Sequence, residues 1–367
     1  MQRGPAEADH SQEDPNGKAE TGVFQANDLR RGLKNIVRPK VARGFSHNTL
    51  YGAAWKVASQ QCLGDISNHF WNVAGVTSST ITMLLKYRFG QLWNMKIAFR
   101  QQRPYLPGLG LPRSALCPHC KQPDSGGHIL GGCKLPPFNA MYIKRHDSAL
   151  RIVLKAIMKG AHGGFYTIAD IGRDELTKDL GVNNKRIPTW LLPDSTLEAA
   201  GIQAVHRHKV RPDILLVEMS HQESTRYRSN LPLLPELNTT VTHPRMPNTR
   251  GAPTERPRKI WIIEGGYTSD TRRPEKAEEK QLQHQQLMHA LRLRGYHAQL
   301  MTFVFGFGGS IYQQTLKDLE ELGVDSTTCK ALLKQIHLHS VEVAAKIIVQ
   351  RRVLDSQKLL SSATRPP

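Results

Sequence analysis

The stretch KIWIIEGGYTSD, residues 259–270, places an acidic residue, Glu264, directly after a short apolar run. The run IWII is rich in β-branched and aromatic residues, which is typical of a buried β-strand. Two similar runs, ILLV at 214–217 and LMTFVF at 300–305, also predict strands, and residues 274–294 have the spacing of a helix. Because strands and helices alternate, the sequence predicts an α/β core.

A second acidic residue, Asp213, stands at the mouth of the first apolar strand in RPDILLVE, residues 211–218. If this strand neighbours the one that precedes Glu264, the two carboxylates converge at one edge of the sheet. Two converging carboxylates bind a hard divalent cation such as Mg²⁺ or Mn²⁺, with water and a phosphate oxygen in the other positions. LLPD at 192–194 offers a second Pro-Asp pair through Asp194.

The helix that follows Glu264 carries two candidate catalytic lysines. Pro274 suits the first turn of a helix, and positions 276, 280, 284, 287 and 291 then form one stripe. Because the stripe ends in two leucines that must face the sheet, Lys276 and Lys280 point inward as well. A lysine in this place can orient a metal-bound water and stabilise negative charge on a phosphate. The choice between the two lysines is open.

Residues 117–133, CPHCKQPDSGGHILGGC, have the ligand types and spacing of a tetrahedral zinc site. Four protein ligands leave no position for substrate, so the zinc is expected to be structural. The Gly pairs let a short loop close around the ion, and His119 is a rival to the histidine of the set. The predicted ligands are Cys117, Cys120, His128 and Cys133. Cys62 and Cys329 are expected to be buried free thiols.

The formal net charge of +19 and the pI of about 9.9 are typical of a protein that binds phosphate backbones. Residues 30–105 hold twelve Lys or Arg and one acid, Asp65. We therefore expect this region to bind nucleic acid. The sequence has neither a long apolar run nor a signal region, so no membrane partner is expected. The candidate contact residues are Lys86, Arg88, Lys96, Arg100 and Arg103.

The composition divides the chain into five predicted parts. The last apolar and helical patterns lie at 314–322 and 328–352, and a Pro-rich stretch without periodicity at about 221–257 is expected to be an inserted loop. The predicted parts are a disordered acidic tail (1–29), a basic helical region (30–110), a CCHC zinc knuckle (111–140), an α/β domain with the inserted loop (141–355) and a second tail (356–367).

The pattern RPD, then an acid closing a second apolar strand, then lysine, resembles the PD-(D/E)xK restriction-like nucleases. The order of the Cys/His knot, then IKRHD, then RPD resembles the C-terminal part of non-LTR retrotransposon polyproteins that carry such an endonuclease. The likeness covers roughly residues 80–350. It implies a restriction-endonuclease-like core and a metal-dependent DNA endonuclease that nicks or cuts genomic target DNA to prime reverse transcription.

Carried onto this chain, the resemblance assigns the metal-binding acids to Asp213 and Glu264. The strict acid-x-lysine spacing would need lysine at Gly266, whereas in the retrotransposon branch the lysine is displaced onto the following helix, to Lys280 or Lys276. The resemblance also implies genomic DNA and the element's RNA as partners, and the nucleus as location. A tyrosine-x-aspartate-aspartate polymerase signature is missing, so no reverse transcriptase activity is expected. The chain is then a fragment of a longer polyprotein or a host gene derived from one.

Two other interpretations compete with this one. In the first, the chain is a nucleic-acid-binding relic or host-adopted protein with an inactive nuclease core. In the second, GFGGS at 306–310 is a phosphate loop of a dinucleotide enzyme, but the full glycine fingerprint is missing and a turn between a strand and a helix is expected instead. His337 and His339 are expected to serve packing and surface roles, because helical residues two apart do not share a face.

Overall fold

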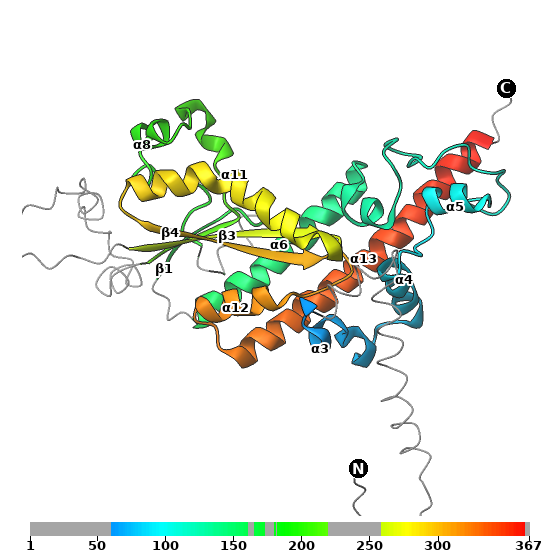
Figure 1. Cartoon of the computed structure of the whole chain (residues 1–367), viewed down its shortest axis with the longest axis horizontal. Coiled ribbons are helices and arrows are strands. Elements are labelled where there is room, and N and C mark those ends of the chain that lie inside the picture. Colours follow the sequence, from blue (N-terminus) through cyan, green and yellow to red (C-terminus); the bar gives the residue numbers. More distant parts are fainter. Residues whose placement is uncertain (1–59, 161–164, 173–179, 181, 219–257, 364–367) are drawn as a thin grey trace, which may run out of the picture. The chain divides into compact units, whose positions relative to one another are not determined.

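The computed structural model describes residues 60–160, 165–172, 180, 182–218 and 258–363 (Figure 1). These residues all belong to one compact unit of the chain, Thr49–Pro367. The predicted tail (1–29) and the predicted loop (221–257) lie outside the described residues. The strand before the loop ends at Glu218. Within the described part, no helix is both long and apolar enough to cross a bilayer.

The structure is mixed α/β, with a four-stranded mixed sheet flanked by helices. The strands lie in the order β1 (Phe165–Ala169), β2 (Ile214–Glu218), β3 (Lys259–Thr268) and β4 (His297–Gly306). β1 and β2 are antiparallel, β2 and β3 are antiparallel, and β3 and β4 are parallel. The three predicted strands are confirmed, and β1 is an additional strand that the sequence analysis did not assign.

Helices cover both faces of this sheet, which explains why its strands read as continuous apolar runs. α11 (Arg273–Leu293) and α8 (Asp194–Ala199) pack on one face, where their cluster includes Ile260 and Ile262 of β3. The opposite face packs against α6 (Pro136–Gly160), α12 (Gln313–Glu321) and α13 (Ser326–Ala363). Figure 1 shows α11 and α12 on opposite sides of the strands.

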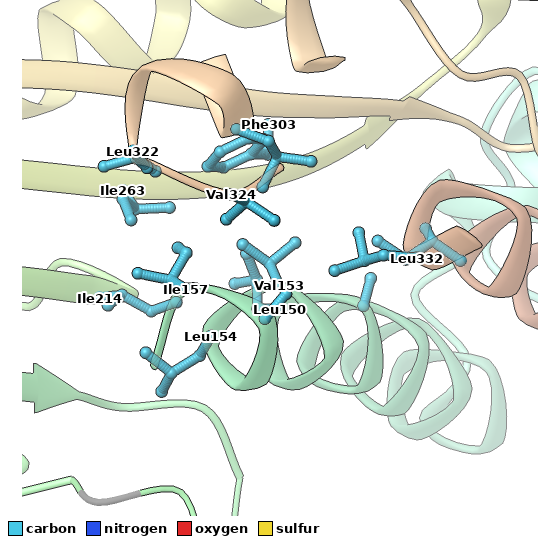
Figure 2. Close-up of a cluster of buried hydrophobic side chains, with 14 of the residues drawn as sticks. Leu150, Val153, Leu154, Ile157, Ile214, Ile263, Phe303, Leu322, Val324 and Leu332 are labelled. Atoms are coloured by element: carbon cyan, nitrogen blue, oxygen red, sulfur yellow. The ribbon is translucent and has the colours of Figure 1, made fainter. Parts of the chain in front are cut away.

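The larger core lies between α6 and the sheet (Figure 2). One face of α6 carries apolar side chains at helical spacing, and they point at the sheet and at the segment around Val324. Each of these side chains is fully buried, so they hold α6 in a fixed position against β2 and β3. The α6 residues labelled in Figure 2 are Leu150, Val153, Leu154 and Ile157.

β3 does not end at the acidic residue, contrary to the prediction that Glu264 closes its strand. The strand continues to Thr268 and stays paired with β4 throughout. Two glycines make this possible, because the helices approach the strand closely from both sides. A Cβ at Gly265 would lie 3.0 Å from His146 Nε2, and a Cβ at Gly266 would lie 3.3 Å from Lys276 Cε. Glu264 is therefore in the middle of a strand, with 1% of its surface exposed.

The described part of the basic region, from residue 60, forms several short helices where one helical module was predicted. They are α3 (Gly64–Ser67), a 3-10 helix (His69–Asn72), α4 (Ser78–Arg88) and α5 (Met95–Gln101). The chain breaks between α4 and α5 at Gly90, which has a φ of 65°. Asn94 then starts α5, and its side chain accepts a hydrogen bond from the N–H of Ile97. Apolar residues of α4 share a core with the Cys/His segment and with α13, so these parts pack as one body.

α13 is longer than the predicted helix 328–352 and extends through most of the predicted tail 356–367, to Ala363. α6 begins at Pro136, inside the segment 111–140 that was predicted as the zinc knuckle. The predicted turn at 306–310 is confirmed, because Gly306 ends β4 and α12 begins at Gln313. Cys62 and Cys329 are buried free thiols, as predicted.

His337 on α13 holds the turn at 306–310 in place. Its side chain is fully buried, its Nδ1 lies 2.6 Å from the Gly309 carbonyl oxygen, and the N–H of Phe70 donates to its Nε2 at 3.3 Å. The proton of the neutral ring is therefore on Nδ1, and Nε2 is an acceptor. Burial lowers the pKa of His337 to about 4. This packing role agrees with the prediction for His337.

We expect His337 to make the protein less stable in mild acid. Its pKa falls from 6.5 to about 4 on folding, so the unfolded chain takes up the proton first and stability is lost as the pH drops from 6.5 to 4. The loss from this group is about 3 kcal/mol, at 1.36 kcal/mol per pKa unit. Urea unfolding at several pH values checks this. His337→Gln should have a flatter pH dependence than wild type, and equal slopes would contradict the assignment.

Candidate functional site

Asp213 and Glu264 meet where β2 begins, because the antiparallel register pairs Ile214 with Ile263. The Asp213 N–H donates to Glu264 Oε1 at 2.9 Å. In return, the N–H of Gly265 donates to Asp213 Oδ2 at 2.7 Å. The two carboxylates predicted from the sequence are therefore brought together by the sheet itself, and each is fixed by a backbone amide of the other strand.

Lys280 and His284 are one turn apart on α11, and they face Glu264 from the side of the sheet that α11 covers. Lys280 Nζ lies 2.8 Å from Glu264 Oε2. His284 Nε2 lies 3.0 Å from Glu264 Oε1, but the orientation of the ring is unsuitable for a hydrogen bond between these atoms. A buried carboxylate is stable only if it is paired and hydrogen-bonded. Glu264 meets this requirement through the ammonium of Lys280 and the backbone of Asp213.

Lys276 is on the same inward face of α11, but its ammonium pairs with a different carboxylate. Its stem passes over Gly266, and its Nζ lies 2.7 Å from Glu279 Oε1. Of the two candidate lysines, the structure places Lys280 at Glu264.

His146 on α6 contacts Asp213 from the opposite face of the sheet. Its Nε2 lies 3.1 Å from Asp213 Oδ2, and its Nδ1 lies 3.1 Å from Asp147 Oδ1. Burial lowers the pKa of His146, but the hydrogen bonds to the two carboxylates outweigh it and raise the pKa to about 9. Burial raises the pKa of Asp213, but His146 and the Gly265 N–H outweigh it, so the pKa lies below its usual value.

No functional role was predicted from the sequence for His146, His284 or Gly265. His146 belongs to IKRHD, which entered only through the resemblance, and His284 was predicted only to share the helical stripe of Lys280. The stripe was a usable signal for His284, because it lies four residues after Lys280 on the same face. Asp194, the alternative Pro-Asp carboxylate, is instead exposed at the start of α8 and pairs with Arg207 at 2.6 Å.

A second site lies between α5 and α6, where four ligand atoms are all within 4.8 Å of one another. The cluster can hold a metal ion such as zinc. Cys120 Sγ is 3.3 Å from His128 Nε2. Gly132 permits a close approach, since a Cβ there would lie 3.4 Å from His128 Nδ1. We call this group the Cys/His cluster. Its members are the four predicted ligands, Cys117, Cys120, His128 and Cys133.

His119, the rival ligand, belongs to a buried ionic network beside the cluster. Its Nε2 lies 2.7 Å from Asp355 Oδ1. Asp355 also accepts from the Arg351 Nε at 2.7 Å and from the Tyr105 hydroxyl at 2.5 Å, and Arg351 reaches Asp124 at 3.3 Å. This network joins the Cys/His cluster to α13, and it takes His119 away from the metal site.

Arg145, the residue before His146, joins the Cys/His cluster to the sheet. Its Nη2 donates to the Leu130 carbonyl oxygen at 2.8 Å, and its guanidinium lies 4.3 Å from the ring centroid of Tyr267 in β3. The side chain is 1% exposed. Arginine stacks on aromatic faces better than lysine does, because its charge is planar and weakly hydrated. Neighbouring residues of α6 therefore contact both sites.

One of the predicted nucleic-acid contacts has a structural role. Arg88 donates to the carbonyl oxygens of Ser67 at 2.7 Å and Gly308 at 3.2 Å and to Asn68 Oδ1 at 2.9 Å, and it lies over the ring of Phe70. The other four keep their charge near the surface. Lys86, Arg100 and Arg103 are exposed, and Lys96 is half-buried.

No family model matches the chain, and neither a curated protein nor a solved structure matches it.

We expect one zinc ion per chain, bound by the Cys/His cluster. Cys133→Ser removes one thiolate and should release the metal and lower the melting temperature, because metal binding contributes directly to folding. Elemental analysis of the purified protein checks this. As matched controls, Cys329→Ser and His119→Ala change a buried thiol and the rival histidine, and both should keep their zinc. A Cys133→Ser protein with full zinc content and an unchanged melting curve would contradict the assignment.

Proposed function

We propose that this chain is a metal-dependent DNA endonuclease with a restriction-like core, derived from a non-LTR retrotransposon. The observation that carries the proposal is the convergence of Asp213, Glu264 and Lys280 from three different elements. The mixed sheet flanked by helices and the Cys/His cluster upstream of it are the arrangement that the resemblance implies. The partners would be genomic DNA and the RNA of the element, in the nucleus.

The donor chemistry at Asp213 and Glu264 fits Mg²⁺ or Mn²⁺. Among the described residues, Asp213 Oδ1 has no hydrogen-bond partner, so one carboxylate oxygen is available as a ligand. Glu264 can give an oxygen when its ion pair with Lys280 is exchanged for one with the metal. A metal bound there would supply an activated water and neutralise charge on the scissile phosphate.

The chain's own residues have separate roles in this proposal. Lys280 is 14% exposed at its side chain, so its ammonium can reach from Glu264 to a phosphate at the surface of the site. There it would stabilise the negative charge that develops as the phosphodiester is cleaved. His146 holds the Asp213 carboxylate in place through Oδ2 and leaves Oδ1 for the metal. His146 is a positioning residue.

One observation favours the inactive alternative, a nucleic-acid-binding relic or host-adopted protein. Both oxygens of Glu264 lie within 3.0 Å of groups of the chain itself, and 1% of the residue is exposed. Such a carboxylate is also what a purely structural ion pair requires. A cleavage experiment separates the two functions.

We expect a supercoiled plasmid to be nicked by the wild-type protein in Mg²⁺ or Mn²⁺. Asp213→Ala and Glu264→Ala should each abolish nicking, because each removes a metal ligand. Lys280→Ala should slow it by about a hundredfold to a thousandfold, as for the loss of one transition-state donor. Lys276→Ala is the matched control on the same helix face and should cut at nearly the wild-type rate.

Gel shifts and melting curves of the same variants show whether binding and folding are intact. Cutting by Asp213→Ala at the wild-type rate would mean that the site is wrongly assigned. A wild-type protein that never cuts with either metal would favour the inactive alternative. If Lys276→Ala is the slower variant, the lysine assignment is reversed.

We expect α5 and the residues that directly follow it to bind nucleic acid through phosphates. Arg100→Gln combined with Arg103→Gln should reduce the slope of log affinity against log salt by about two, because each lost phosphate contact removes about one. Fluorescence anisotropy on a labelled duplex checks this. The matched control, Lys317→Gln with Lys330→Gln, removes two exposed charges from α12 and α13 and should keep the slope. Equal slopes for the two double variants would place the binding surface elsewhere.

A further inference from the structure

A cavity of about 410 Å³ lies between α11 and the segment 201–210, beside the candidate active site. This volume is within the range of about 300 to 1,000 Å³ that small-molecule pockets have. Its polar lining consists of amides and imidazoles: Gln203, His206, Gln283, His284 and Gln286. Neither lysine, arginine, aspartate nor glutamate is among its lining residues. A neutral polar group therefore fits it better than a phosphate or a carboxylate.

His284 connects this cavity to the candidate active site. It is 4% exposed, lines the cavity, and has its Nε2 3.0 Å from Glu264 Oε1. A group in the cavity is thus separated from Glu264 by one imidazole ring. Gln286 reaches over from α11 towards the facing segment, since a Cβ at Gly201 would lie 3.7 Å from its Nε2.

The lining has the chemistry that recognises a nucleobase. A glutamine amide offers a donor and an acceptor side by side, which matches the edge of a base such as adenine. Ile202 and Leu287 are buried and line the same cavity, so they provide apolar surface for the faces of the ring. Gln283 and Gln286 are exposed, so a base can reach the amides from solvent.

A second cavity, of about 240 Å³, adjoins the first, and Val210 lines both. Unlike the first, it is cationic, with Arg186, Arg207 and Arg211 in its lining. Arg207 is paired with Asp194 at 2.6 Å and Arg211 is 3.6 Å from Asp170. Arg186 is exposed and forms no ion pair with a described residue. Arginines in this place can contact the phosphates of the strand whose base is in the neighbouring cavity.

We propose that the cavity lined by Gln283 and Gln286 binds one unpaired base of a DNA strand whose phosphates contact the arginine cavity. The inference rests on the proposed nuclease function, because it places this nucleotide next to the phosphodiester to be cut. The segment 201–211, which leads directly into Asp213, then serves to position the substrate. An unpaired base implies a strand that is single-stranded or locally opened at the site.

The test measures binding by the full chain without added Mg²⁺, so that no strand is cut. Two fluorescent DNA strands of equal length and equal phosphate number are compared, an oligoadenylate and its fully abasic counterpart. We expect the wild type to bind the oligoadenylate about tenfold more tightly, the effect of one well-placed base contact. Gln283→Leu combined with Gln286→Leu should lose most of this preference. Gln285→Leu, exposed on the same helix and outside the cavity lining, should keep it.

A second pair of variants separates phosphate from base contacts. Arg186→Gln should weaken binding of both strands alike and reduce the salt slope by about one. Lys317→Gln, on the helix layer that covers the other face of the sheet, should change neither. Melting curves confirm that all variants are folded.

Three results would overturn the inference. They are a wild type that binds neither strand, a wild type that binds both strands equally, and a preference that survives the loss of both glutamines. Plasmid nicking by the same preparations distinguishes this failure from failure of the nuclease proposal. Nicking without a base preference would reject the proposed base pocket and leave the nuclease proposal standing. If the protein never nicks but has a base preference that depends on the two glutamines, the pocket is supported and the nuclease proposal is rejected.

Discussion

The ion pair between Glu264 and Lys280 is the interaction on which the arrangement of the sheet and α11 depends. Taking a carboxylate out of water costs several kcal/mol unless charges and hydrogen bonds replace the water. At 1% exposure, Glu264 needs a cation from α11 and an amide from the start of β2. The helix is thereby fixed in rotation, so that Leu287 and Leu291 pack on the same face. The start of β2 is fixed as well, which brings Asp213 to the same place.

A second ionic network does the same for the Cys/His cluster. Arg351, Asp355 and Asp124 are all at most 1% exposed, and they come from α13 and from the cluster's own loop. Breaking a buried pair by removing one partner costs about 3 to 5 kcal/mol, because the other charge is left unpaired. This network and the apolar contacts around it explain why the basic helices, the cluster and α13 pack as one body. The boundaries at 110 and 140, predicted from the Pro/Gly-rich linker and the Cys/His motif, stay predictions.

Local patterns predicted much of the fold and part of the candidate site. Helical periodicity alone put Lys280 and Leu287 on one face, and the apolar runs located three of the four strands. β1 was missed because its sequence, FYTIA, has no run of consecutive aliphatic residues, whereas β2, which has the same length, contains ILLV. The contacts that sequence reasoning missed join distant residues: His146 with Asp213 across 67 positions, and His119 with Asp355 across 236. Such pairs depend on how helices pack on the sheet, and no periodicity or spacing reports that.

α6 contacts both sites through adjacent residues, Arg145 at the Leu130 carbonyl and His146 at Asp213. The apolar face of α6 that follows these two residues is fully buried, so both side chains project from a firmly packed helix. Thermodynamic linkage then makes the two sites reciprocal. Whatever change an ion in the Cys/His cluster makes in ligand affinity at Asp213, a ligand at Asp213 makes the same change in the affinity for that ion. Retention of the ion in the cluster therefore measures the same coupling as ligand affinity at Asp213.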